Sequence, residues 1–170
     1  MAEFTSPHRL NHAAYVTWDT AATVAFYRDV MGMRLISYAT AEEVPSTAEK
    51  NHFLHTFFEM TDGGCIAFFE IEGLPPEEVE TPVPRWARHI ALSVDSEEEL
   101  MSALRHLKGH HIDVTGPVDH EGIWTSLYFF DPNGIRLEIT YQNRKFTDED
   151  SAKAYKDVDA WLAEHGNVKA

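Results

Sequence analysis

Hydrophobic positions along this chain alternate as in a strand, then recur every three to four residues as in a helix, and then alternate again. This order occurs twice. The first half predicts one strand, one helix and three further strands. These lie at residues 9–18, 20–30, 33–40, 52–60 and 65–72. Asp19 or Thr20 caps the predicted helix, Phe26 and Val30 lie one turn apart on it, and Gly32 ends it. An acidic loop at residues 41–50 separates two of the strands.

The second half repeats this order after a proline- and glutamate-rich linker, residues 74–84. Its strand, helix and three strands are predicted at residues 88–94, 97–109, 110–116, 122–130 and 135–141. Ser96 and Glu99 form a capping box at the start of the helix. His12 and His89 occupy the same place in the first strand of each half, which indicates an internal duplication.

These boundaries predict one domain at residues 1–146, with modules at about 9–73 and 85–142, and a helical extension at 147–170. Thr147 and Asp150 offer a capping box for a third helix at about 148–164. One apolar stripe follows its helical period: Ala154, Val158, Trp161 and Leu162. We expect this helix to cover the core or to contact a second subunit.

Charge narrows the range of partners. The 170 residues include 14 basic and 28 acidic side chains, a net charge of −14, which disfavours nucleic acid and anionic membranes. No apolar run approaches the roughly 20 residues that span a bilayer. The N-terminus lacks the apolar core of a signal peptide, and the single cysteine, Cys65, fits a reducing compartment. We therefore expect a cytoplasmic protein with a small-molecule substrate.

Strand alternation places three metal-binding side chains on comparable faces. His89 shares its face with small side chains, opposite the apolar face that packs on the helix. Glu138 likewise lies opposite the aliphatic face of the last strand, and His12 holds the matching place in the first. Two imidazoles and one carboxylate leave coordination positions open, which suits non-haem Fe(II) and also Zn²⁺.

The residues also resemble a known family. LNHAAYVTWDTAATVAFYRDVMGMRL, and the second half from RHIALSV to the turn DPNGIRLEITY, are similar to the vicinal oxygen chelate superfamily. Its members include glyoxalase I, type I extradiol dioxygenases, methylmalonyl-CoA epimerase, and fosfomycin- and bleomycin-resistance proteins. The resemblance implies an α+β fold in which two βαβββ modules form a cupped mixed sheet around a metal cleft. It also implies that His12, His89 and Glu138 are the ligands, and it favours a homodimer.

A fourth ligand is left open. Glyoxalase-type members add a side chain from the last strand of the first module, where Glu70 is the candidate. Aligning the turns TDGG and DPNG without a gap instead puts Phe68 opposite Glu138.

The second half is most similar to the dioxygenase-like members. Tyr128 and His120 match a tyrosine and a histidine that lie near the chelated substrate there, and the resemblance gives both a catalytic role. Such enzymes also carry a base histidine where this chain has Gly64, and His52 and His55 are the nearby substitutes.

We expect a dioxygenase-like enzyme that uses Fe(II) on a vicinal diol or catechol, with Mn, Ni or Zn as other metals. One alternative is a glyoxalase- or epimerase-type lyase or isomerase. The other is a small-molecule-binding resistance protein.

Overall fold

The computed structural model describes residues 6–75 and 83–165, whose first part forms a four-stranded mixed sheet. Its elements are β1 (His12–Val16), α1 (Thr20–Ala25), the π-helical turn η1 (Phe26–Val30), β2 (Arg34–Glu43), β3 (Lys50–Glu59) and β4 (Cys65–Ile71). The strands follow the order β1-β4-β3-β2. β1 runs parallel to β4, and the other neighbours are antiparallel.

The second part repeats this arrangement. Its elements are the 3₁₀ turn η2 (Arg85–Ala87), β5 (Ile90–Val94), α2 (Glu97–Gly109), β6 (Thr115–His120), β7 (Trp124–Phe130) and β8 (Arg136–Gln142). The order β5-β8-β7-β6, with β5 parallel to β8, matches the first sheet strand for strand. The predicted α+β class and duplicated order are therefore confirmed. Residues 76–82 of the predicted linker lie outside the described residues.

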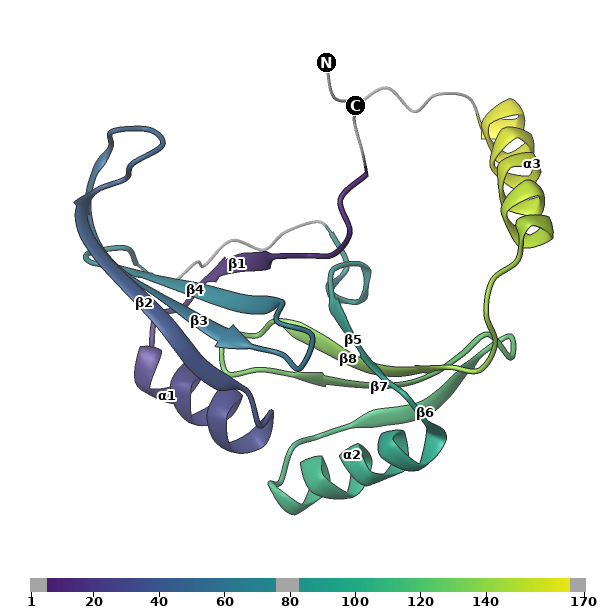
Figure 1. Ribbon diagram of the computed structural model, residues 1–170, viewed down its shortest axis with the longest axis horizontal. Coiled ribbons are helices and arrows are strands. Elements are labelled where there is room, and N and C mark those ends of the chain that lie inside the picture. The colour runs from purple at the N-terminus through teal and green to yellow at the C-terminus, as the bar shows by residue number, and fades with distance from the viewer. Residues whose placement is uncertain (1–5, 76–82, 166–170) are drawn as a thin grey trace.

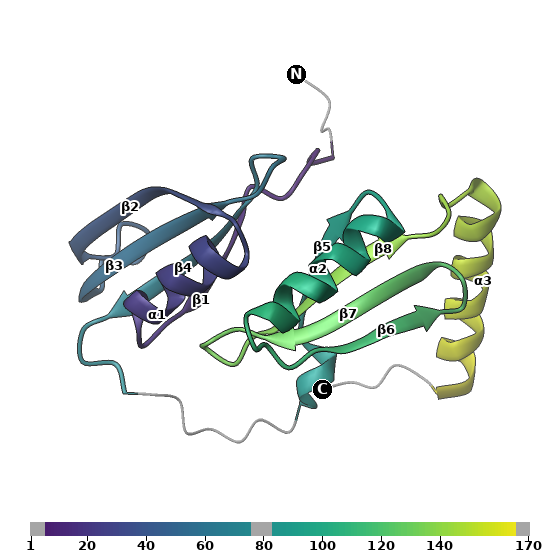
Figure 2. The same ribbon diagram turned by 90° about the horizontal axis from the view of Figure 1, so that it is seen from below.

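Both helices begin where the sequence predicts. The Asp19 carboxylate accepts a hydrogen bond from the Ala22 amide at 2.9 Å, and the Ser96 hydroxyl accepts one from the Glu99 amide at 3.2 Å. Each helix then packs its apolar stripe on the sheet of its own module, and Figures 1 and 2 show α1 and α2 on the same side of the molecule. Among the described elements, no helix covers the opposite face of either sheet.

One apolar core lies between helices and sheets and runs through both modules. Its largest fully buried side chains come from η1, β3, β4, β7 and α2: Tyr27, Phe58, Phe68, Phe129 and Leu100. Polar contacts fix the junction as well, because the Tyr27 hydroxyl donates to Asp131 at 3.1 Å. His106 Nε2 lies 2.8 Å from the Val30 carbonyl oxygen. The modules are thus held together on their helical side.

Three strands, β2, β3 and β6, differ from the prediction. β2 and β3 extend to a Glu43–Lys50 pair, so the strands include both ends of the predicted acidic loop. Residues 44–49 connect them. β6 begins at Thr115, whereas the sequence predicted a strand at residues 110–116. The amides of His110, His111 and Ile112 are hydrogen-bonded to the last carbonyls of α2, so this stretch ends the helix and cannot join a sheet.

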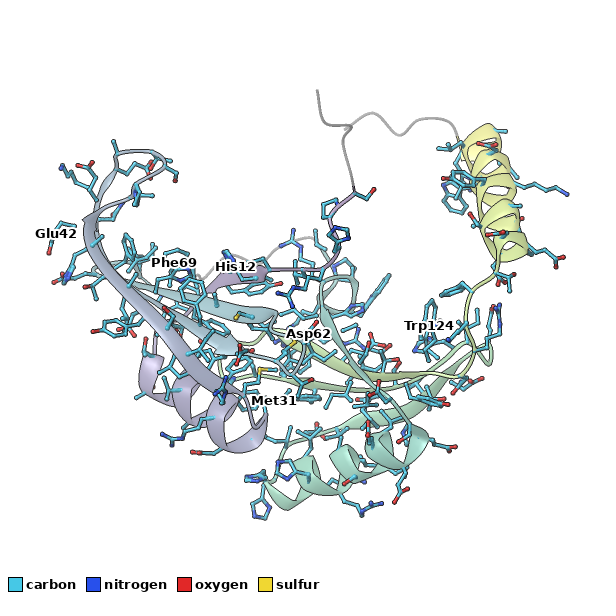
Figure 3. The ribbon with its side chains drawn as sticks, in the orientation of Figure 1. His12, Met31, Glu42, Asp62, Phe69 and Trp124 are labelled. Carbon is cyan, nitrogen blue, oxygen red and sulfur yellow. The ribbon has the colours of Figure 1, made fainter. Side chains whose placement is uncertain are left out.

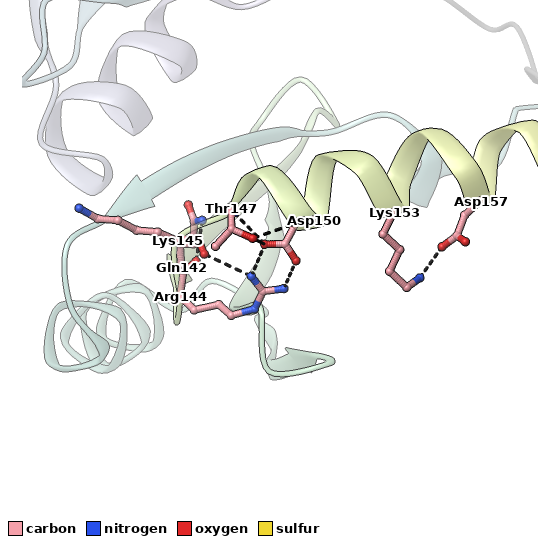
Figure 4. A network of polar contacts seen from close by, with 7 residues as sticks. All are labelled: Gln142, Arg144, Lys145, Thr147, Asp150, Lys153 and Asp157. Atoms are coloured by element: carbon pink, nitrogen blue, oxygen red, sulfur yellow. Dashed lines mark hydrogen bonds and ion pairs between the residues drawn. The ribbon is translucent and has the colours of Figure 1, made fainter.

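The last helix, α3 (Asp148–His165), lies beyond the second sheet. Figure 4 shows its start, where Arg144 forms a bidentate ion pair with Asp150 at 2.8 Å, and the Thr147 amide donates to the same carboxylate. No described residue of α3 is buried, so the helix does not cover the core. Among the described helices, none is long and apolar enough to cross a membrane.

Candidate metal centre

The uncovered face of the second sheet collects polar side chains around Glu138. The strand register pairs Ala91 of β5 and Tyr128 of β7 with Glu138 of β8. Paired residues share a face, so Glu138 lies between the strand that follows His89 and the strand that carries Tyr128. The helix side of the same strands is filled by Leu127, Phe129 and Leu137.

Glu138 is a buried carboxylate with 7% of its surface exposed. Ser126 donates a hydrogen bond to its Oε1 at 2.6 Å, and the Ser126 hydroxyl lies 2.8 Å from that of Thr140. Its other oxygen, Oε2, lies 3.0 Å from Nε2 of His89. A buried carboxylate is expensive unless it is paired, so this arrangement requires a positive partner at Oε2.

His89 is oriented by a backbone carbonyl. Its Nδ1 lies 3.2 Å from the Trp86 carbonyl oxygen, which only accepts, so Nδ1 carries the proton and Nε2 points at Glu138. A lone pair and a carboxylate facing each other need a cation between them or a proton on the ring. Neighbouring ligands about 2.1 Å from an octahedral ion lie ~3.0 Å apart, which is the spacing observed here. The residues therefore fit a divalent metal ion.

Tyr128 and His120 form a pair beside this carboxylate. The Tyr128 hydroxyl lies 2.8 Å from Nε2 of His120, across the β6–β7 edge of the sheet. Burial raises the pKa of Tyr128, and the negative charge of Glu138 raises it further. The phenol therefore stays protonated at neutral pH. The structure brings together these four sequence-predicted residues: His89, Glu138, Tyr128 and His120.

His12 lies on the uncovered face of the first sheet, as Figure 3 shows, in an aromatic setting. Its Nδ1 is 2.7 Å from the Asn11 side-chain oxygen, and its ring makes an edge contact with Phe57 at 5.5 Å between centroids. His55 lies on the same face, 6.4 Å away between ring centroids, and stacks on Phe69 at 3.6 Å. The first sheet thus offers one candidate ligand surrounded by flat apolar rings.

His55 is the residue that sequence reasoning undervalued. Burial lowers its pKa, and its Nδ1 lies 3.0 Å from the Phe68 carbonyl oxygen, so the ring is neutral with Nε2 free to accept a proton. The sequence does place His55 and Phe57 two residues apart, and therefore on one face of their strand. Only the strand register, which pairs His55 with Phe69, shows that this is the open face. His52, the other substitute, is exposed and bound to Glu72 at the rim.

Glu70 lies apart from this face. Its carboxylate accepts a hydrogen bond from the Thr20 amide at 2.9 Å, at the start of α1. The register explains the placement, because Ala14 pairs with Ala67 in the first module as Ala91 pairs with Glu138 in the second. Ala67, and neither Phe68 nor Glu70, is therefore the counterpart of Glu138.

The three predicted ligands are not assembled by one chain. His89 and Glu138 are in contact, whereas the side chains that contact His12 among the described residues, Asn11, His55 and Phe57, belong to the first module. Within residues 6–75 and 83–165, no group of three histidine, cysteine or acidic side chains converges on a common point. His89 and Glu138 therefore lie together on the second sheet, and His12 lies separately on the first.

Comparison with known proteins agrees with this fold. The family model of the Glyoxalase/Bleomycin resistance protein/Dioxygenase superfamily matches residues 9–139, so the chain belongs to that superfamily. Its members generally bind a divalent metal and a small-molecule substrate.

Two curated relatives are each 29% identical to this chain over 135 residues, which are 79% of it. One is the uncharacterized protein YaeR of Escherichia coli, 96% of which is covered. The other is biphenyl-2,3-diol 1,2-dioxygenase 3 of Rhodococcus globerulus, of which the match spans 64%. A solved glyoxylase/bleomycin resistance protein/dioxygenase domain from Frankia sp. EAN1pec shares the fold, with a TM-score of 0.64 and 16% identity over 81% of this chain and 99% of that one.

Proposed function

We propose that this protein is a dioxygenase-like enzyme that uses Fe(II) to open the ring of a small catechol or to cleave another vicinal diol. The observation that carries the proposal is the contact between His89 and the buried Glu138 carboxylate, 3.0 Å apart beside Tyr128. With His12 they form the two-histidine, one-carboxylate set that suits this metal. When bound, the metal would supply the Lewis acidity and the electrons for reaction with oxygen.

The residues around the set perform separate tasks. Ser126 and the Trp86 carbonyl fix the orientation of Glu138 and His89, so that their lone pairs stay directed at the same point. Tyr128, kept protonated by its surroundings, donates its one hydroxyl proton to a substrate oxygen. His120 donates its Nε2 proton to the phenol oxygen, which holds the phenol in place and replaces the hydroxyl proton if that is transferred. The rings of Phe57 and Phe69 provide a flat apolar wall for an aromatic substrate.

The third ligand comes from a second copy of the chain. The shared core and the bond from Tyr27 to Asp131 hold the two modules of one chain in fixed positions, which keeps His12 away from Glu138. A two-fold dimer supplies each His89–Glu138 pair with the partner subunit's His12 and gives two equal sites. His55 then arrives with His12 and serves as the base that removes a proton from the substrate.

The glyoxalase-type alternative needs a fourth ligand from the first module. Its candidate, Glu70, is bound to the Thr20 amide on the helix side, and Ala67 occupies the matching place on the open face. This observation favours the three-ligand set and, with it, the dioxygenase over the lyase or isomerase.

Oxygen uptake after anaerobic loading with Fe(II) tests the proposed reaction. With catechol, 3-methylcatechol and biphenyl-2,3-diol as substrates, we expect one O₂ consumed for each ring opened. Tyr128→Phe should lower kcat by roughly 100-fold, because the donated hydrogen bond is lost while the metal ligands remain. Tyr155→Phe, on the exposed face of α3, is the matched control. Absence of uptake with these diols and with 3,4-dihydroxybenzoate, in protein that binds stoichiometric Fe(II), rejects the dioxygenase and favours an isomerase or lyase.

A further inference from the structure

Two arginines at one end of the open face have no carboxylate partner within the described residues. Arg28, Arg34 and Arg144 each form an ion pair with an acidic neighbour, as expected in a chain with twice as many acids as bases. Arg85 and Arg136 instead donate to backbone carbonyls, those of Gly134 and Trp86. Their charge is therefore available to a ligand.

Both guanidinium groups lie along the wall of one hollow of about 460 Å³. Its wall also includes Trp86, Tyr128 and Phe130, so it is aromatic. The one acidic residue in its lining, Asp113, is outnumbered by the two arginines. A volume in this range suits a single small ligand. The hollow thus provides a flat apolar surface and two positive groups.

The guanidinium groups are preorganised by stacking. Arg136 lies 4.0 Å above the centroid of the Tyr128 ring, and Arg85 lies 4.3 Å above that of Phe130. Each uses one of its five N–H groups on the backbone, at 2.9 Å for Arg136 and 3.4 Å for Arg85. The remaining donors form the planar fork that matches the two oxygens of a carboxylate.

This hollow adjoins the candidate metal centre. The Trp86 carbonyl that accepts from Arg136 is the same oxygen that faces Nδ1 of His89. Arg136 and Glu138 are two residues apart on β8 and share its open face, and Tyr128 contacts both groups. A ligand held by the arginines therefore lies on the same face of β8 as the candidate metal-binding carboxylate.

We propose that Arg85 and Arg136 bind the carboxylate of an aromatic acid, whose ring lies between Trp86 and Tyr128. The inference rests on the proposed function for one point only, that the ring oxygens of the substrate point at the metal centre. It specifies the substrate class as a carboxylated aromatic diol. A single carboxylate also fits the charge of the chain, because a net charge of −14 disfavours ligands with several negative charges.

Binding of a matched pair of probes to metal-free protein tests the anion site without the chemistry. Naphthalene-2-carboxylate and naphthalene-2-carboxamide differ in charge but hardly in shape. We expect the carboxylate to bind about tenfold tighter or more, measured by calorimetry and by quenching of Trp86 fluorescence. Trp86→Phe identifies the quenched side chain among the four tryptophans.

Substitution then assigns the preference to the two arginines. Arg136→Gln and Arg85→Gln should each remove most of the discrimination, and Arg136→Lys should retain part of it. Arg28→Gln, which changes the same charge at an exposed site, should leave it unchanged. Equal affinity for the two probes in the unmodified protein, or full discrimination in both glutamine variants, overturns the inference. Because the probes are measured on metal-free protein and the oxygen assay includes neutral as well as carboxylated diols, failure of one proposal is distinguishable from failure of the other.

Discussion

Glu138 depends on the hydroxyl group that holds it. Ser126 is fully buried, and its hydroxyl proton is directed at one carboxylate oxygen, which leaves the other oxygen for His89. Residues that support a ligand in this way tune metal affinity without contacting the metal. The same argument applies to the Trp86 carbonyl behind His89.

Ser126→Ala should weaken binding of Mn²⁺ or Zn²⁺ by about 10- to 100-fold, because Glu138 loses the donor that orients it. The affinity is measured by competition with a chelating dye, and circular dichroism checks that the fold is retained. Thr125→Ala is the matched control, since this neighbour on β7 faces the other way and bonds with Asn143. Equal affinities for the Ser126 variant and the unmodified protein contradict the supporting role.

Sequence reasoning found the acidic and histidine candidates but not their support. Alternation along a strand is enough to put His89 and Glu138 on open faces. It does not fix which residue of a neighbouring strand lies opposite, so neither the role of Ser126 nor the place of His55 beside His12 was predictable. Glu70 was considered for the same reason, because only the register shows that Ala67 is the counterpart of Glu138.

At the scale of elements, the turn between β7 and β8 fixes the second module against the first. Asp131 accepts hydrogen bonds from the amides of Asn133 and Ile135, which form the turn, and from the Tyr27 hydroxyl, which comes from η1. Burial raises the pKa of Asp131, which shows that the charged carboxylate is costly at this place. The hydrogen bonds from these donors offset the free-energy cost of burying it. One carboxylate therefore stabilises both the turn and the junction of the modules.

Tyr27→Phe keeps the ring in the core and removes one hydrogen bond, so we expect a loss of about 1 kcal/mol in the free energy of unfolding. Asp131→Ala removes the turn bonds as well and should cost about 3 kcal/mol. Urea denaturation measures both, and Tyr38→Phe on exposed β2 is the control. A tyrosine variant as unstable as the aspartate variant would show that the turn contributes nothing.

The elements themselves were largely predictable, since caps and periodicity are local properties. The exception is β6, whose prediction started too early because Ile112 and Val114 are apolar. Both side chains pack against the core, but from the segment that follows α2. The amides at the start of this segment, including that of Ile112, are hydrogen-bonded to carbonyl oxygens of the helix. Apolar spacing alone does not distinguish such a turn from a strand.

At the scale of the whole molecule, the chain presents a candidate metal-binding pair and a separate histidine on faces that no described helix covers. The duplication predicted two equivalent sheets but not how they meet, because contacts between modules involve residues distant in sequence, such as Tyr27 and Asp131. The common cleft therefore stays a prediction, and the proposed function places it between two chains. The apolar side chains of Val158 and Trp161 on α3 are exposed. That α3 contacts a second subunit through them stays a prediction.

The metal content of two single variants and their mixture tests the central claim most directly. After anaerobic dialysis against Fe(II), elemental analysis should find one ion per subunit in the unmodified protein and in the rim variant His52→Ala. His12→Ala and Glu138→Ala should each hold almost none. Unfolded together in equal amounts and refolded, they should recover about a quarter of the full content, since half of the dimers are mixed and each has one intact site. Full metal content in either single variant, or none in the mixture, contradicts the shared three-residue site.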